Sequence, residues 1–238
     1  MARDSFRPDE IRFYGRRQGR RLRQGRLDLV DALLPAVTIP EPPPEATVDP
    51  GGFFDFRPAA VWLEIGFGGG EHLAHQALAH PDIGFIGCEP YLNGVAGLIG
   101  HMADKDLKNI RIFPEDARRL LPRLREASIQ RAFTLFSDPW PKTRHSRRRF
   151  IQPETLDQLA RILADGAELR FASDDMGYVR WALMHLSAHP AFEWTAHRPA
   201  DWRRRPVDGF ETRYEAKALR AGRKAAHLRF RRRARKSA

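Results

Sequence analysis

The sequence predicts an α/β fold, a mostly parallel sheet of seven strands with helices on both faces. Two observations predict it. From residue 60 onward, short apolar runs alternate with longer amphipathic segments, which is typical of strands joined by crossover helices. The first apolar run, 60–65, meets a cluster of glycines, as a buried parallel strand does where it turns into a helix beside a ligand. Crossovers should be right-handed, and ligands should bind at the carboxyl ends of the strands.

The alternation gives the elements in order. Strands are predicted at 60–66, 83–89, 109–113, 131–137 and 167–173, and helices at 69–80, 91–104, 116–127, 152–164 and 175–188. Pro153 suits the first turn of its helix, and Gly166 suits the end of the same helix. Two further strands are predicted at 191–196 and 212–219, which completes the seven.

The segments outside this alternation predict the domain organisation. Apolar residues at 27, 29, 30, 33 and 34 indicate a short amphipathic helix, and five prolines with two glycines between 40 and 52 indicate a linker. The chain therefore divides into a basic N-terminal arm (1–26), a short helix with a Pro-rich linker (27–52), a catalytic domain (53–222) and a basic C-terminal tail (223–238).

The positive charge is concentrated in the two ends. The chain carries a net charge of +11; residues 1–26 hold nine arginines and three acids, and residues 216–238 hold ten basic residues and no acid. These ends contribute +6 and +10, which leaves −5 for residues 27–215. Two basic, arginine-rich arms on a mildly acidic domain are typical of a nucleic-acid partner, although such runs can also be solvated and disordered.

Other classes are disfavoured. No apolar run approaches the roughly 20 residues of a membrane span, and no apolar region follows the basic N-terminus as in a signal peptide. The single cysteine, Cys88, cannot form an internal disulfide. A cytoplasmic protein is expected. The histidines at 72, 75 and 80 share one predicted helix without an evident carboxylate or cysteine partner, so no metal site is expected.

The glycine cluster predicts a ligand site. A dinucleotide fingerprint needs a third glycine where Glu71 stands, which disfavours a nicotinamide-dependent dehydrogenase. The pattern is instead acid-x-Gly-x-Gly-x-Gly, and it resembles motif I of Rossmann-like S-adenosylmethionine-dependent methyltransferases. Its members are Glu64, Gly66, Gly68 and Gly70.

Acids at the next two strand ends extend this site. Glu89 ends the second strand, where carboxylates accept hydrogen bonds from ribose hydroxyls. Asp116 follows the third strand, where it could accept from an adenine amino group, cap the next helix, or do both.

The end of the fourth strand is the most distinctive stretch. Asp138, Pro139 and Trp140 follow an apolar run and place a carboxylate and a rigid turn at the same edge of the sheet. A basic run comes next, which predicts contact with RNA, although a solvated loop is the plain alternative. Its members are Lys142, Arg144, His145, Arg147, Arg148 and Arg149.

Taken together, these motifs resemble the bacterial tRNA (guanine-N7-)-methyltransferase family, which has a class I, Rossmann-like fold. The likeness covers 53 to about 222, including the run 212–215. The Arg-Gln-Gly-Arg element of the arm also resembles family members. Two residues depart from the family pattern: Ser137 stands where proline is usual, and Gly69 stands where a larger residue such as methionine is common.

The resemblance implies methyl transfer from S-adenosyl-L-methionine to N7 of a tRNA guanine, guanine 46 of the variable loop. Guanine N7 is a lone pair that attacks without losing a proton, so positioning and a carboxylate near the forming cation suffice. Asp138 is the candidate catalytic residue, and it also belongs to the implied cofactor site. The implied substrate residues are Lys142, the basic residues 144–149, Asp174, Thr212, Arg213, Tyr214 and Glu215.

Some alternatives stay open. Asp174 could instead cap the helix that starts near Asp175, and Glu215 could be an exposed strand acid paired with Lys217 or Arg213. An amino-group methyltransferase acting on N6 of adenine or N2 of guanine also uses an Asp-Pro-aromatic turn. A non-catalytic RNA-binding module would explain the charge but not the strand-end acids. Both a monomer and a homodimer are compatible with the sequence.

Overall fold

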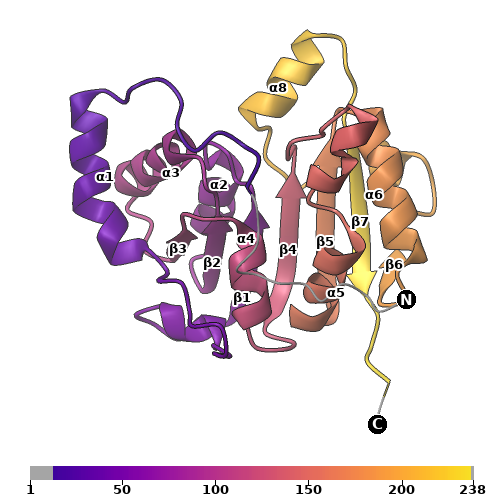
Figure 1. The fold of residues 1–238 in the computed structure, drawn as a ribbon, viewed down its shortest axis with the longest axis horizontal. Helices are drawn as coiled ribbons and strands as arrows, with labels where there is room; N and C mark the ends of the chain where they lie inside the picture. Colours follow the sequence, from indigo (N-terminus) through magenta and orange to yellow (C-terminus); the bar gives the residue numbers. More distant parts are fainter. Residues whose placement is uncertain (1–12, 237–238) are drawn as a thin grey trace.

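The structure, a computed structural model, describes residues 13–236 of the 238-residue chain. Its centre is a seven-stranded sheet in the order β3-β2-β1-β4-β5-β7-β6 (Figure 1). Only β7 runs antiparallel to its neighbours, which confirms the predicted mostly parallel sheet. The strands are β1 Ala60–Ile65, β2 Ile83–Cys88, β3 Ile110–Phe113, β4 Ile129–Leu135, β5 Leu163–Ser173, β6 Phe192–Trp194 and β7 Ala226–Arg232.

Strands β1 and β2 form the buried middle of the sheet. They pair in parallel register, with Ile65 opposite Cys88, so both end at the same edge. Successive side chains point to opposite faces, and the core divides accordingly. Val61 and Leu63 belong to one apolar cluster, while Trp62 belongs to the other. Because both faces are covered, these strands are almost continuously apolar, which is why their positions could be predicted.

Helices cover both faces. Figure 1 shows α1, α2 and α3 beside the half of the sheet that contains β1, β2 and β3, and α5 and α6 beside the other half. The α-helices are α1 Gln24–Val37, α2 Glu71–Ala79, α3 Leu92–Lys105, α4 Ala117–Leu120, α5 Pro153–Ile162, α6 Met176–Ala188, α7 Ala200–Arg203 and α8 Arg213–Arg220. Between residues 13 and 236, the 3-10 turns are η2 Pro50–Phe53, η3 Leu121–Arg123 and η4 Thr143–Arg148. No helix within the described residues combines the length and apolar character needed to cross a bilayer.

Two predicted elements are wrong. Residues 212–219 do not form a strand: Thr212 caps helix α8 by accepting from the backbone N–H of Glu215 at 3.2 Å. The predicted helix 116–127 is much shorter, because after α4 the chain tightens into η3, which contains Pro122. A proline lacks the N–H that a continuing helix needs.

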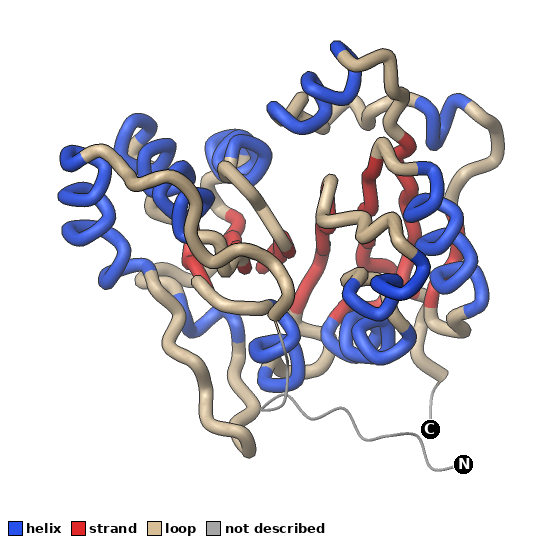
Figure 2. Tube along the Cα trace, turned by 45° about the horizontal axis from the view of Figure 1, so that its top comes forward, coloured by secondary structure: helices blue, strands red, loops and turns tan. Residues whose placement is uncertain are grey.

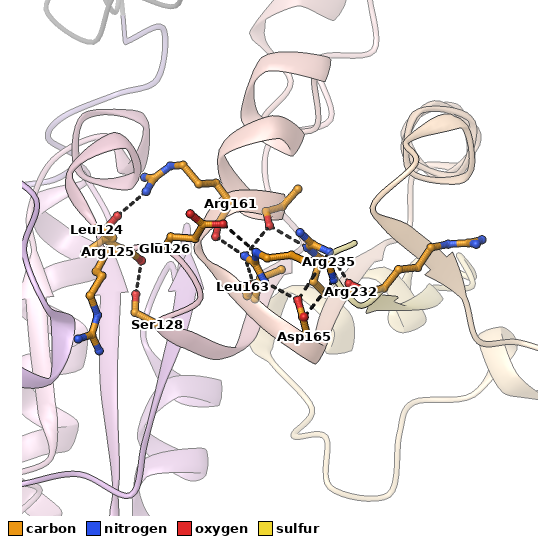
Figure 3. Close-up of polar contacts among 11 residues, drawn as sticks. Leu124, Arg125, Glu126, Ser128, Arg161, Leu163, Asp165, Arg232 and Arg235 are labelled. Carbon is orange, nitrogen blue, oxygen red and sulfur yellow. Dashed lines mark hydrogen bonds and ion pairs between the residues drawn. The ribbon is translucent and has the colours of Figure 1, made fainter. Parts of the chain in front are cut away.

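The seventh strand comes from the segment predicted to be a basic tail. β7 lies between β5 and β6, and its inward-facing Leu228 and Phe230 are buried. Its basic end is fastened to the protein (Figure 3): Arg232 Nε donates to the carbonyl of Ala160 at 2.8 Å, and Arg235 pairs with Asp165. Residues 226–235 are therefore part of the domain.

The N-terminal arm is ordered over its described part. Residues 13–23, which we call the strap, run as a loop toward the start of α1 (Figure 2). Arg17 makes a two-point ion pair with Glu115 at 2.9 Å, and the Gly19 N–H donates to Asn93 Oδ1 at 2.7 Å. Helix α1 confirms the predicted helix near residues 27–37. Residues 1–12 of the predicted arm lie outside the described residues.

Candidate active site

A cleft of about 760 Å³ lies at the carboxyl edge of the strands. Its walls come from the ends of β1, β2 and β4, from the strap and from residues at the start of α8. It gathers most of the residues predicted to bind the cofactor: Glu64, Gly66, Gly68, Glu89, Asp116 and Asp138. Gly70 is the exception, since it does not line the cleft and instead begins α2 as its N-cap.

The glycine turn has the geometry that the sequence predicts. Gly66, Gly68 and Gly70 have φ values of 70°, 57° and 79°, in the left-handed region that favours glycine. A Cβ on Gly94 of α3 would lie 2.2 Å from the Gly68 carbonyl oxygen, so α3 also needs a glycine to approach the turn this closely.

Glu89 is buried, with 9% of its surface exposed, and both carboxylate oxygens accept backbone hydrogen bonds. The donors are the N–H groups of Gly68 at 2.8 Å and Tyr91 at 3.0 Å. Burial nevertheless raises the pKa of Glu89 to about 7, because desolvation outweighs these hydrogen bonds and nearby Asp138 adds to the shift. Glu89 therefore fixes the backbone of the glycine turn through its hydrogen bond with Gly68, and it also lines the cleft.

Glu64 has a partner that sequence reasoning missed. Its Oε2 lies 2.7 Å from Nδ1 of His72, and each of the two side chains is 3% exposed. His72 also packs edge-on against Phe133. The sequence did contain a signal for this contact. Glu64 lies on β1 and His72 lies eight residues later, in the first turn of α2. The glycine turn between them brings that helical turn beside the end of the strand.

Asp116 caps α4. Its Oδ1 accepts from the N–H of Arg118 at 3.0 Å, and the same carboxylate binds the Arg118 guanidinium. Of the two roles that the sequence left open, the capping role is confirmed. The carboxylate also lines the cleft, so a role toward adenine stays a prediction.

The Asp-Pro-Trp turn is held in a strained conformation. Phe136, two residues before the turn, and Trp140, its last residue, have φ values of 53° and 43°, a region that large L-residues rarely adopt. Asp138 is exposed at the mouth of the cleft, and partial desolvation raises the pKa of its carboxyl group. It makes no hydrogen bond or ion pair with any of residues 13–236. Its position therefore depends on the backbone of the turn.

The basic loop divides into outward and inward residues. Lys142, Arg144 and Arg147 are exposed on or beside η4, as a contact with RNA requires. Arg148 lies over the rings of Tyr14 and Trp140, at 4.5 and 5.0 Å from their centroids, and thereby joins the loop to the strap.

His145 and Arg149 complete the basic loop. Partial desolvation and the surrounding cations, Arg148 and Arg144 among them, lower the pKa of His145, which favours its neutral form. Arg149 differs from the outward residues of the run. It is buried, and its Nε donates to the Pro139 carbonyl at 2.8 Å.

The predicted substrate residues do not all reach the cleft. Thr212 and Tyr214 line it, whereas Asp174, Arg213 and Glu215 do not. Asp174 pairs with Arg223 at 2.7 Å, and it does not cap α6, because Asp175 does so by accepting from the Tyr178 N–H. The capping alternative for Asp174 is therefore wrong.

Glu215 is buried rather than exposed. Its Oε1 lies 3.4 Å from Nε2 of His227 and 3.7 Å from Nε of Arg205. The alternative of an exposed strand acid paired with Lys217 or Arg213 is therefore wrong. His227 ties α8 to β7, and Arg205 ties it to the loop after α7.

The start of α8 lies over the glycine turn. The Tyr214 ring is the nearest group to the place a Cβ on Gly68 would take, at 2.9 Å. Arg213 pairs with Glu71 at 3.2 Å, and its guanidinium lies where a side chain on Gly69 would begin. A larger side chain at position 69 would collide with the Arg213 guanidinium, which explains the glycine there. The other departure, Ser137, places its hydroxyl 3.4 Å from the Tyr178 hydroxyl.

The cleft fits S-adenosylmethionine in its chemistry. Its volume lies within the roughly 300–1,000 Å³ of small-molecule sites. The turn has no Cβ atoms at Gly66 and Gly68, so a ligand can approach the backbone, and several carboxylates can accept from hydroxyl and amino groups. Among the described residues, no group of three or more His, Cys, Asp or Glu side chains is arranged to hold a metal ion.

Solved structures share the fold. The 16S rRNA methyltransferase KamB matches with a TM-score of 0.56 at 16% identity, over 74% of this chain and 89% of that one. An rRNA methylase from Streptococcus thermophilus matches with a TM-score of 0.51 at 12% identity, over 74% of this chain and 87% of that one. At these identities the likeness shows a methyltransferase-type α/β fold and no more.

Sequence comparison shows the family. A model described as "Putative methyltransferase" matches residues 58–228. The tRNA (guanine-N(7)-)-methyltransferase of Rhodospirillum rubrum is 57% identical over 95% of this chain and 90% of its own length. The protein of the same name from Paramagnetospirillum magneticum is 54% identical over 94% of both chains. With such identity over nearly its whole length, the chain belongs to the tRNA (guanine-N(7)-)-methyltransferase family.

Proposed function

We propose that this chain transfers a methyl group from S-adenosyl-L-methionine to N7 of a guanine in tRNA, at position 46 of the variable loop, in the cytoplasm. The single observation that carries the proposal is the cleft, which joins the glycine turn, Glu89 and Asp138 beside the basic loop. The family membership supports both the reaction and the tRNA substrate. Position 46 comes from the family resemblance.

Different residues of the cleft would bind different parts of the cofactor. Glu89 would accept from the ribose hydroxyls, Asp116 would accept from the adenine amino group, and Glu64 would lie beside the methionine or ribose end. The N–H of Gly68 is already bonded to Glu89, so the turn keeps its shape before the ligand arrives. When bound, the cofactor supplies an electrophilic methyl group on a sulfonium.

Asp138 would act on the guanine. N7 needs no base, because its lone pair lies in the plane of the ring and carries no proton. The purine gains positive charge as N7 is methylated, and a carboxylate close to it stabilises that charge most when little water intervenes. The partial desolvation that raises the pKa of Asp138 suits this role.

RNA would bind across the mouth of the cleft. The exposed side chains of Lys142, Arg144 and Arg147 can contact phosphates, with Arg148 and His145 beside them. Guanine presents N1–H and N2 amino donors, so its selection over adenine needs acceptors. Asp174 and Glu215 are the proposed acceptors, together with Thr212, Arg213 and Tyr214 at the start of α8. Asp174 and Glu215 must exchange their present partners, Arg223 and His227, to reach the base.

The test is methylation of bulk tRNA that lacks the modification, with labelled S-adenosylmethionine. Borohydride reduction followed by aniline cleaves RNA at N7-methylguanosine, so label and cleavage at position 46 are expected. Label without cleavage would instead indicate an amino-group methyltransferase acting on N2 of guanine or N6 of adenine. Absence of label at saturating tRNA would favour a non-catalytic RNA-binding module.

A further inference from the structure

Arg149 is the last residue of the basic run, but its side chain turns into the protein. Only 8% of its surface is exposed. Its Nε donates to the Pro139 carbonyl at 2.8 Å, and its Nη2 donates to the Trp140 carbonyl at 3.3 Å. One guanidinium therefore holds two successive carbonyls of the turn that carries Asp138.

The guanidinium is itself fixed by helix α6. Its central carbon lies 5.5 Å from the ring centroid of Tyr178 and 5.0 Å from that of Trp181. Tyr178 is fully buried, and Trp181 Nε1 donates to the Ile151 carbonyl at 2.6 Å. The rings thus form a rigid cation-binding site that faces the turn.

The turn needs such support. Phe136 and Trp140 both have positive φ, which is costly for large side chains and persists only where the surroundings enforce it. Asp138 bonds to none of the described residues, so no contact of its own side chain holds it in place. The hydrogen bonds from Arg149 to the carbonyls of Pro139 and Trp140 fix the backbone directly after Asp138.

We infer that Arg149 is a positioning residue for methyl transfer: it fixes the Asp-Pro-Trp turn, and through it the Asp138 carboxylate, and it does not contact tRNA. The inference rests on the proposed function. Lysine cannot replace Arg149, because a single ammonium lacks the planar fork that reaches both carbonyls and stacks between rings. Arg147, two residues earlier, is exposed, and under the proposed function it contacts RNA.

Kinetics separate the two roles. Arg149→Lys should lower kcat on tRNA at least tenfold and leave KM for tRNA within about twofold. The matched variant Arg147→Ala should raise KM for tRNA severalfold and leave kcat nearly unchanged. A raised KM with wild-type kcat for Arg149→Lys would overturn the inference and indicate an RNA contact.

A double-mutant cycle tests whether Arg149 acts through Asp138. If it does, Arg149→Lys should reduce kcat much less in an Asp138→Asn background than in the wild type. Equal reductions in both backgrounds would show a general structural effect and overturn the inference. Should Arg149→Lys unfold at the assay temperature, Trp181→Phe loosens the same guanidinium. A reduction in its kcat is expected, and an unchanged value would overturn the inference.

Hydrogen exchange gives a readout independent of activity. The Phe136 N–H bonds to the Ala172 carbonyl at 2.7 Å and reports on the turn. Arg149→Lys should speed exchange in the peptide containing Phe136 but not in β1 or β2. If Arg149→Lys sped this exchange but the wild-type protein failed to methylate tRNA, the positioning of the turn by Arg149 would stand and the proposed function alone would fail. Unchanged exchange would overturn the positioning role.

Discussion

Two buried carboxylates of the cleft are accommodated in different ways. Glu64 faces the imidazole of His72, whereas Glu89 has only neutral backbone N–H donors directly against it. The two N–H donors compensate the buried charge of Glu89 only in part, so desolvation raises the pKa of Glu89 to about 7. Near neutral pH, Glu89 is therefore poised between its protonated and ionised forms.

Because the pKa of Glu89 is about 7, both stability and cofactor affinity should depend on pH near neutrality. In the folded chain without ligand, the pKa of Glu89, about 7, lies above its unfolded value of about 4.3, so its contribution to stability is lost as pH rises through 7. Ribose hydroxyls donate to the ionised form, so cofactor affinity should rise about fivefold to tenfold between pH 6 and 8.

Calorimetry on the wild type and on Glu89→Gln measures the effect. The ratio of their dissociation constants at each pH isolates Glu89, since the two proteins share every other titrating group and the cofactor's own amino group. The variant should bind weakly at all pH values. A ratio that does not change between pH 6 and 8 would contradict the assignment of Glu89 to the ribose.

The sequence predicted those residues of the cleft whose positions depend only on where the strands end. Glu64, Glu89 and Asp138 were identified because parallel strands bring their carboxyl ends to one edge. The roles of His72 and Arg149 were not predicted, since each depends on how a side chain turns after the chain has reversed direction. For Arg149, net charge alone favoured an outward, RNA-facing position.

At the scale of elements, two local signals were present in the sequence but were outweighed. Thr212 and Glu215 have the Ser/Thr-x-x-Glu spacing of a helix N-terminus, and Thr212 does cap α8. Residues 228–231 alternate between apolar and basic residues, as a strand does, but the arginines of β7 made this segment resemble a solvated tail. The first five strands, and the helices that follow all but the third of them, were predicted because their apolar runs carry few charges.

The basic end of β7 should therefore stabilise the fold rather than bind RNA. Arg235 pairs with Asp165 and Glu126, and its Nη2 donates to the carbonyls of Arg161 and Leu163 near the end of α5 (Figure 3). Arg235→Ala should lower the free energy of unfolding in urea by about 1–3 kcal/mol, because charge-assisted hydrogen bonds are lost.

The matched control is Lys236→Ala, which changes the same charge at an exposed neighbour. It should leave stability unchanged, and neither variant should alter tRNA affinity under conditions where both are folded. Weaker tRNA binding by Arg235→Ala at unchanged stability would show that this end contacts RNA.

At the scale of the molecule, basic residues from two segments border the cleft. Phe13 to Arg16 of the strap and Arg148 of η4 line it, and Tyr14 and Arg148 join the two segments. Arg229 to Arg233 belong to β7 or follow it, and β7 runs from the carboxyl end of β5 toward its start. The two basic ends of the sequence should therefore have different roles.

Salt dependence distinguishes these roles. Replacing the exposed strap residues Arg20, Arg21 and Arg23 with glutamine should weaken tRNA binding and flatten the plot of log affinity against log salt, by roughly 0.7 to 0.9 per lost phosphate contact. The methylated position should not change.

The charge-matched control replaces Arg231, Arg233 and Lys236 with glutamine. It removes three exposed positive charges from the other end and should keep the wild-type slope. Equal flattening by both triple variants would indicate that net charge, and not the place of the strap beside the cleft, governs binding.

The place of β7 in the sheet has a consequence for biosynthesis. β5 is complete at Ser173, but the strand that covers its edge begins only at Ala226, and among the strands of the described residues β6 pairs with β7 alone. While the ribosome makes the intervening residues, the growing chain exposes an unpaired strand edge, a site where other nascent chains can add. A slow passage through the codons of this interval would prolong that exposure, so translation speed there should influence how much of the protein escapes aggregation.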